Sequence, residues 1–145
     1  MLLLSNTCNY GIRAALYVAS QDDLKFVPIR KIADDLKISF HFLTKILQML
    51  TQKNIMVSYR GPNGGVSFAR PTSEISLLDI IDAIDGLEGF QGCILGLPLC
   101  NNEHPCPLHE KWAIVREDLK NAFLNENLLD LTQRIKDFGL RISNQ

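Results

Sequence analysis

The sequence has no uninterrupted apolar run of about 20 residues, the length that a membrane-spanning helix needs. The longest apolar stretches, such as Ile75 to Ile84, are broken by polar residues, here one serine and two aspartates. The apolar start, Met1 to Leu4, has no basic flank and ends at a serine, so it does not read as a secretion signal. We therefore expect a cytoplasmic protein with no membrane partner.

The sequence also lacks the motifs of the common enzyme classes. It contains no Walker loop, no G-x-G-x-x-G, no G-x-S-x-G and no carboxylate pair of recognisable spacing. Its four cysteines form no C-x-x-C pair, an arrangement common in thiol redox enzymes. We therefore expect that the protein is not an enzyme, with a thiol redox enzyme as the alternative.

Proline and glycine together make only 15 of the 145 residues, too few for a low-complexity chain. With 46% hydrophobic and 21% charged residues, the composition is that of an ordinary globular domain. A mass of 16.3 kDa suits one domain, or one small domain with an extension used for assembly.

Charge is divided unevenly along the chain, although the net charge is only −1. Residues 1–72 carry nine Lys/Arg against four Asp/Glu, whereas residues 73–145 carry six against twelve. This polarity predicts that the first half meets a polyanion. The alternatives are charges that only solvate the surface, and a domain of the same fold that binds protein instead of nucleic acid.

The first half has the periodicity of three helices followed by a hairpin. Residues 5–20 form a helix capped by Ser5 or Thr7, Pro28 takes the first position of a second helix, and Ser39 caps a third. The second and third form a helix-turn-helix pattern, and the third exposes polar side chains opposite its apolar stripe. Two short β-rich runs with a glycine-rich tip follow, which together predict a winged helix.

The second half consists of a helix, a long loop and two more helices. Ser76 and Asp79 predict a capping box at the start of the fourth helix. Residues 87–107 have no usable period, and such long loops usually serve a function. A helix with an apolar stripe follows. It predicts dimerisation, because a protein that reads two DNA half-sites must hold two copies of its DNA-binding domain one helical turn apart. The alternative is that this helix packs on its own domain. The stripe consists of Trp112, Val115, Leu119, Ala122 and Phe123.

These patterns predict a mainly α fold with a small β-hairpin: a winged helix-turn-helix plus a long C-terminal dimerisation helix. The expected organisation is a DNA-binding domain over residues 1–86, a cysteine-containing loop over 87–109, and a dimerisation helix with a C-terminal helix over 110–145.

Three of the four cysteines, Cys93, Cys100 and Cys106, are spaced C-x6-C-x5-C within the loop. A cysteine cluster in a cytoplasmic chain favours metal binding or redox chemistry over structural disulfides. The spacing is wider than the short spacings of structural zinc sites and suits an iron–sulfur cluster; zinc, a thiol switch and inert cysteines remain open. His109 lies three residues after Cys106 and can face the same site, whereas the alternative is a capping or surface histidine.

Several segments, in chain order, resemble the family of bacterial winged-helix transcriptional regulators that includes IscR, NsrR and CymR. The resemblance covers nearly the whole chain and includes an Arg-Gly-x-x-Gly-Gly wing. The matching segments are Tyr10-Gly11-Ile12-Arg13-Ala14, Ile32-Ala33, residues 38–43, Ser58-Tyr59-Arg60-Gly61-Pro62-Asn63-Gly64-Gly65, Ile80-Ile81-Asp82-Ala83-Ile84, and Cys106-Pro107-Leu108-His109 before Trp112.

The resemblance implies a homodimer on a roughly palindromic double-stranded DNA operator. The third helix would enter the major groove and the wing tip the minor groove, whose negative potential favours arginine. The position that carries a glutamate in IscR is Thr44 here, which leaves the operator sequence open. The positions that match the family's DNA contacts are Ser39, His41, Thr44 and Lys45 in the helix and Arg60, Gly61 and Gly64 in the wing.

The resemblance also implies an iron–sulfur cluster. The three loop cysteines match its ligands, and His109 matches the histidine that completes the cluster in IscR, which favours [2Fe-2S] over [4Fe-4S]. In some related nitric oxide sensors the fourth ligand is a carboxylate of the other subunit's first helix, where this chain has Asn9, a poor ligand. Cys8 beside it is an alternative fourth ligand, with a small buried cysteine as the favoured interpretation. The implied function is a repressor that senses nitric oxide, redox state or iron–sulfur status; the alternative is a cluster-free, zinc-based or thiol-based regulator.

Overall fold

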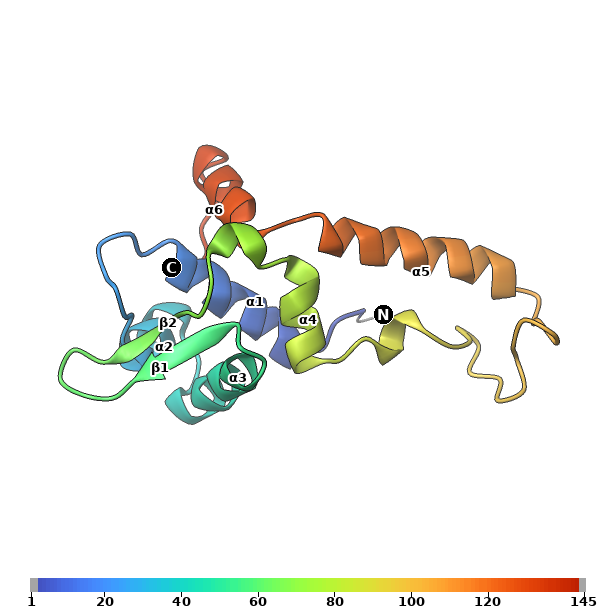
Figure 1. Cartoon of the computed structure of the whole chain (residues 1–145), viewed down its shortest axis with the longest axis horizontal. Coiled ribbons are helices and arrows are strands. Elements are labelled where there is room, and N and C mark those ends of the chain that lie inside the picture. The colour runs from blue at the N-terminus through green and yellow to red at the C-terminus, as the bar shows by residue number, and fades with distance from the viewer. Residues whose placement is uncertain (1–2, 144–145) are drawn as a thin grey trace.

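The structure is a computed structural model that describes residues 3–143, so that Met1 and Leu2 of the apolar start lie outside the described residues. This part of the chain folds into six α-helices, one antiparallel hairpin and two short 3-10 helices (Figure 1). The predicted fold class, mainly α with a small β-hairpin, is confirmed. In chain order the elements are α1 (Asn6–Ala19), α2 (Ile29–Leu36), α3 (Phe40–Gln52), β1 (Met56–Tyr59), β2 (Gly65–Phe68), η1 (Thr72–Glu74), α4 (Leu77–Ile84), η2 (Glu88–Phe90), α5 (His109–Leu124) and α6 (Leu128–Asp137).

Side-chain caps start several helices where the sequence predicts them. Ser5 and Ser39 each accept a backbone N–H three residues on at 3.0 Å, and Ser76 forms a reciprocal capping box with Asp79. Pro28 differs from the prediction, because it precedes the second helix instead of taking its first position. Its ψ of 134° is extended, and only its carbonyl takes part in the helical hydrogen bonding.

One core of buried side chains joins α1, α2, α3, the hairpin and α6. Leu128 at the start of α6 is fully buried in this core, and its backbone N–H donates to Ile75 O at 2.9 Å. The segment 110–145 therefore divides in space, because α6 returns to the body of the protein while α5 does not. The largest fully buried side chains include Ile32, Leu36, Leu43, Ile46, Leu50, Ile75, Ile80 and Leu128.

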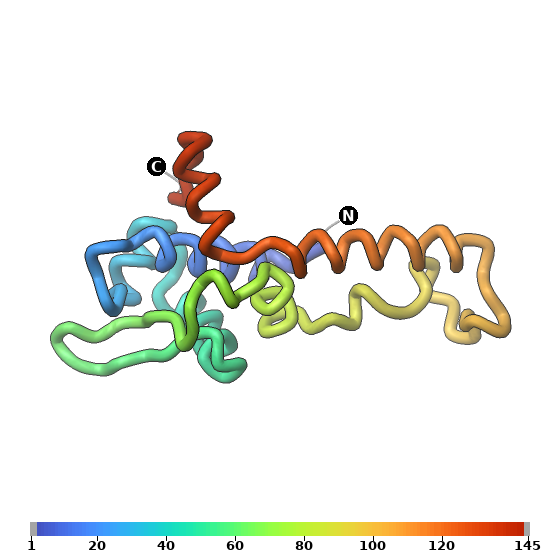
Figure 2. The backbone as a smooth tube through the Cα atoms, turned by 45° about the horizontal axis from the view of Figure 1, so that its top comes forward, coloured from blue at the N-terminus to red at the C-terminus, as the bar shows by residue number. Residues whose placement is uncertain are grey.

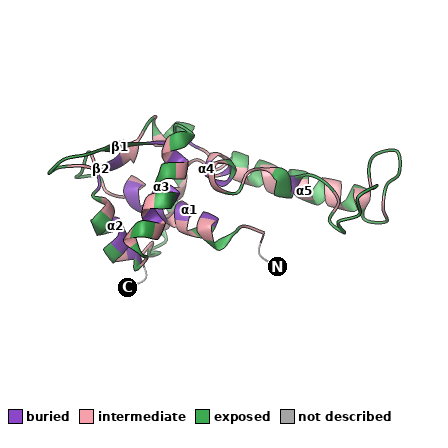
Figure 3. Cartoon of the chain, turned by 90° about the horizontal axis from the view of Figure 1, so that it is seen from below, coloured by how far each residue is buried: buried purple, intermediate pink, exposed green. Residues whose placement is uncertain are grey.

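Helix α5 forms an arm that projects from this body, and residues 91–108 run outward beside it to the arm's tip (Figures 1 and 2). None of its residues is buried, and Figure 3 shows exposed and half-buried positions along its length. Within residues 3–143, neither this helix nor any other has the length and apolar character needed to cross a bilayer.

The wing is fastened to the body at Gly65, and substituting this glycine tests the attachment. Its φ is +154°, and a Cβ here would lie 2.1 Å from Val27 O, which accepts the N–H of Val66. We expect Gly65→Ala to lower the free energy of unfolding by about 2 to 4 kcal/mol through backbone strain and overpacking. Gly92→Ala is the control, because Gly92 has a φ of +75° and nothing within 4 Å of a Cβ. If urea unfolding shows that Gly65→Ala and Gly92→Ala lower the free energy of unfolding equally, the proposed steric conflict at Gly65 is contradicted.

Candidate metal centre and nucleic-acid interface

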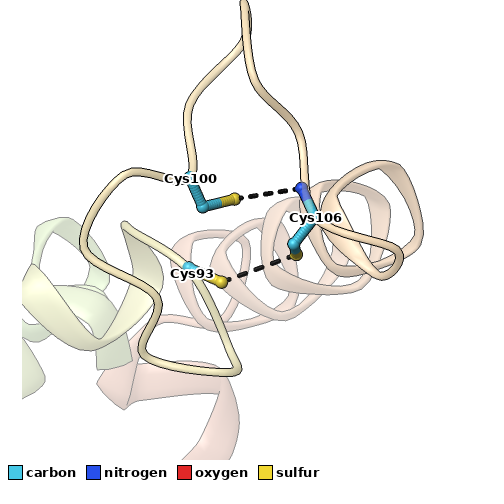
Figure 4. A group of neighbouring side chains, drawn as sticks. All are labelled: Cys93, Cys100 and Cys106. Atoms are coloured by element: carbon cyan, nitrogen blue, oxygen red, sulfur yellow. Dashed lines mark hydrogen bonds between the residues drawn. The ribbon is translucent and has the colours of Figure 1, made fainter.

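The three loop cysteines converge at the tip of the arm, although six and five residues separate them in sequence. Their Sγ atoms all lie within 4.8 Å of one another, and Figure 4 shows the three side chains turned toward a common space beside α5. Cys93 Sγ lies 3.5 Å from Cys106 Sγ, while Cys100 Sγ accepts the backbone N–H of Cys106 at 3.4 Å. All three side chains are half-buried.

His109 adds a nitrogen donor to this group. It is the first residue of α5, and its Nδ1 lies 3.3 Å from Cys100 Sγ. Three sulfurs and one imidazole nitrogen are ligands that both zinc and iron–sulfur clusters accept in proteins. The residues present therefore fit a metal ion or a cluster, and these four are the ones that would hold it.

The electrostatics of the site favour a thiolate at Cys93. A hydrogen bond from the backbone at Leu97, with a smaller contribution from Cys106, lowers the pKa of the Cys93 thiol to about 7. Desolvation raises the pKa of Cys106, whose Sγ lies 3.5 Å from that of Cys93. At neutral pH a substantial fraction of Cys93 is therefore thiolate, the form that binds metals.

Cys8, the alternative fourth ligand, does not join the other cysteines. It is fully buried between α1 and α4, in an apolar cluster with Leu78, Ile81 and Phe90. Burial and the nearby Asp85 raise the pKa of its thiol to about 12, which disfavours the thiolate form. Within residues 3–143, His109 is the better fourth donor.

Polar contacts that sequence reasoning missed hold the loop in place. The guanidinium of Arg116 in α5 donates to Gly92 O at 2.9 Å, which fixes the backbone next to Cys93. The carboxamide oxygen of Asn102 lies 3.0 Å from His109 Nε2. The Asn101-Asn102 pair between two cysteines was the only signal in the sequence for the Asn102 contact, and nothing in the sequence signalled the Arg116 contact. His104, which also lies in the loop, contributes its backbone N–H to the loop turn and is exposed.

The apolar stripe of α5 divides between two sides of the helix. Leu119 and Phe123 pack toward the cluster that contains Phe90, whose ring centroid lies 6.0 Å from that of Phe123. Val115 and Ala122 are exposed instead. The α5 helix therefore packs on its own chain along one side and presents apolar side chains to solvent along another.

The predicted DNA-reading residues lie on and beside one groove of about 750 Å³ between α3 and the hairpin. Thr44, Arg60, Gly61 and Gly64 line it, and the Thr44 hydroxyl also donates to Phe40 O at 2.8 Å. Three further predicted residues lie on α3 or at its start, outside the groove lining, and are exposed: Ser39, His41 and Lys45.

The groove also contains a cation that sequence reasoning did not select. Arg30 in α2 lies over the Phe40 ring, with its guanidinium carbon 4.3 Å from the ring centroid. Together with Arg60 it makes the groove cationic, and no acidic residue is part of its lining. This charge suits a phosphate backbone between helix and wing.

Comparisons with known proteins agree with this architecture. Residues 4–134 match the family described as "Rrf2: Iron-dependent Transcriptional regulator". A protein of Aquifex aeolicus, named by inference as an HTH-type transcriptional regulator, is 29% identical over 132 residues, 90% of this chain and 91% of that protein.

Two solved structures are also similar. CymR of B. subtilis, described as the global cysteine regulator, has a TM-score of 0.77 and 24% identity, covering 92% of this chain and 98% of that one. T. potens IscR has a TM-score of 0.75 and 20% identity, covering 95% of this chain and 91% of that one. At these identities the structures show a shared fold.

Proposed function

The chain belongs to the Rrf2 family of transcriptional regulators, and on that premise we propose that it is a homodimeric repressor controlled by an iron–sulfur cluster at Cys93, Cys100, Cys106 and His109. The signal it reports is nitric oxide, redox state or iron–sulfur status. Transcription regulation and DNA binding are properties of the family, and the relatives found are transcriptional regulators, which are not enzymes. The predicted membership of the family with IscR, NsrR and CymR is confirmed.

The observation that carries the proposal is the convergence of three sulfurs within 4.8 Å, with an imidazole nitrogen 3.3 Å from one of them. Cysteines that served only as loop packing would not need to meet at one point, and half-burial leaves them open to small reactants. The match of His109 to the histidine that completes the cluster in IscR favours a [2Fe-2S] cluster, with [4Fe-4S] as the alternative.

The protein's own residues would connect this centre to DNA binding. Iron–thiolate bonds, once formed, are open to attack by nitric oxide and oxidants. With a cluster bound, the three cysteines would connect distant points of loop 87–109, and His109 would connect the loop to α5, the arm that we propose for dimerisation. Loss of these connections would change how the α5 arms of a dimer position its two DNA-binding domains, residues 1–86 of each copy. Helix α6 packs on the DNA-binding domain of its own chain. A coupling of about 1 to 3 kcal/mol would change operator affinity roughly 5- to 150-fold.

Anaerobic purification tests the cluster. We expect a coloured protein with iron and acid-labile sulfide, whose resonance Raman or Mössbauer spectrum gives the number of irons. Nitric oxide should bleach the colour and change affinity for an operator selected from random duplexes. A colourless, iron-free protein with unchanged operator affinity would contradict the proposal.

In the proposed complex the third helix, α3, enters the major groove and the wing enters the minor groove. Ser39, His41, Thr44 and Lys45 would contact the first, and Arg60 with the wing glycines Gly61 and Gly64 the second. The wing tip is compact at Gly64, because a Cβ there would lie 2.3 Å from Tyr59 O and would force the two backbone segments apart.

Replacing Arg60 tests the wing contact. If Arg60 neutralises one phosphate, Arg60→Ala should reduce the slope of log affinity against log salt by about 0.9, since one fewer counterion is released. Fluorescence anisotropy between low and moderate salt measures this slope. Lys111→Ala is the control, because it removes the same charge from the distant arm and should leave the slope unchanged. An identical slope in both variants would remove Arg60 from the interface.

A zinc-based or thiol-based regulator is the second candidate, favoured by one observation. Cys93, with its pKa lowered to about 7, lies 3.5 Å from Cys106, an arrangement suited to thiol chemistry without iron. Zinc in the purified protein, or an operator response to peroxide in the iron-free protein, would favour this candidate.

A further inference from the structure

We propose that Asn102 positions His109, fixing the tautomer of its ring so that Nδ1 is the atom offered to the metal centre. The inference rests on the proposed function, because it assigns a role in the same centre to a residue that is not a ligand. Asn102 lies in the loop between Cys100 and Cys106, and His109 begins α5.

The contact between Asn102 and His109 determines which ring nitrogen of His109 carries the hydrogen. The Asn102 carboxamide oxygen, 3.0 Å from His109 Nε2, accepts hydrogen bonds and cannot donate them. The hydrogen of a neutral ring therefore resides on Nε2, which leaves the lone pair of Nδ1 free. Nδ1 is the nitrogen that lies 3.3 Å from Cys100 Sγ, on the side of the converging sulfurs.

The preceding asparagine holds Asn102 in place. The carboxamide oxygen of Asn101 accepts the backbone N–H groups of Glu103 at 2.9 Å and His104 at 2.8 Å. The backbone of Asn101 also donates to His104 O at 3.3 Å, which closes the turn. Two consecutive asparagines thus have different tasks, since the first shapes the turn and the second reaches back to the histidine.

Such an outer contact affects metal binding through the ligand that it orients. Partners that accept the second N–H of a ligating histidine typically change metal affinity about 10- to 100-fold when removed. Asn102→Leu keeps the size of the side chain but removes the acceptor, whereas Asn102→Asp keeps an acceptor oxygen. If metal affinity falls in Asn102→Leu but is retained in Asn102→Asp, the effect comes from the hydrogen bond and not from the shape of the side chain.

The first experiment uses the metal-free full chain, so that its outcome does not depend on the proposed cluster. Long-range 1H–15N spectra of the histidine rings report which nitrogen carries the hydrogen. We expect a single Nε2–H tautomer for neutral His109 in the unmodified protein and in Asn102→Asp, and a mixture in Asn102→Leu. An unchanged tautomer in Asn102→Leu would overturn the inference.

The second experiment uses Co²⁺ as the probe and measures its affinity by competition with a chelator. We expect Asn102→Leu to weaken binding about tenfold or more, with little change in Asn102→Asp or in the control Glu103→Gln. In a His109→Ala background, Asn102→Leu should have no further effect, because the ring is gone. A further loss there would show that Asn102 only shapes the loop, and would overturn the positioning role. Absence of Co²⁺ binding to the unmodified protein would overturn the metal-centre part of both proposals, whereas the tautomer spectra would still decide the Asn102 contact.

Discussion

Replacing Cys93, Cys100 and Cys106 together with serine is expected to abolish iron and sulfide binding and to remove the response of operator affinity to nitric oxide. Serine hydroxyls do not ionise at neutral pH, so the variant loses every thiolate that would hold the cluster. The unmodified protein should change affinity about 5- to 150-fold on exposure, as is typical of allosteric coupling, whereas the variant should not respond. Iron and sulfide assays, with anisotropy before and after exposure, measure both effects.

Cys8→Ala is the matched control for this triple replacement. Cys8 is fully buried in a separate apolar cluster, so its removal should cost some stability while iron content and the response stay intact. Loss of iron in Cys8→Ala alone, with the fold preserved by circular dichroism, would identify Cys8 as a ligand and contradict the separation seen here. Retained iron in the triple variant would contradict the assignment of the centre itself.

Local signals in the sequence predicted most of the fold because they act over a few residues. Ser39 and Ser76 cap helices through bonds to backbone N–H groups three positions on, and such contacts depend on local sequence alone. Pro28 was misplaced by one position because its fixed φ suits both the helix start and the residue before it. The division of the α5 stripe was missed because periodicity gives a helix an apolar side without saying what that side meets.

The candidate site was predictable only in part, for a physical reason. Cysteine and histidine are recognisable as metal ligands from residue type alone. The sequence was therefore sufficient to select Cys93, Cys100, Cys106 and His109. The supporting contacts could not, because they depend on how an irregular loop folds back on α5. Arg116 meets Gly92 across 24 residues, and no periodic pattern encodes that contact.

The dimer proposal leads to the second large effect, which concerns the exposed side of α5. Ile114 is 65% and Val115 48% exposed, so in a single chain this helix leaves apolar side chains in water. The double replacement Ile114→Glu/Val115→Glu would place two charges in an apolar interface, where unpaired charge is costly, and should give monomers. Losing the second DNA-binding domain removes its effective concentration, which should weaken operator binding about 10²- to 10⁴-fold. Sedimentation and anisotropy on duplexes with one or two half-sites measure the two effects.

Lys120→Glu is the charge-matched control, since it also changes the net charge by two units. Lys120 lies four residues after Arg116, which donates to Gly92 O, so it is on the side of α5 that faces its own chain. We expect this control to remain dimeric and to prefer two half-sites over one. The double variant should bind both duplexes equally and weakly, because a monomer cannot use a second half-site. A dimeric double variant that keeps full affinity would show that other surfaces join the two copies, and the arm would then serve only to carry the metal centre. A monomer that keeps full affinity would instead show that one DNA-binding domain is sufficient, and the cluster would have to act within a single chain.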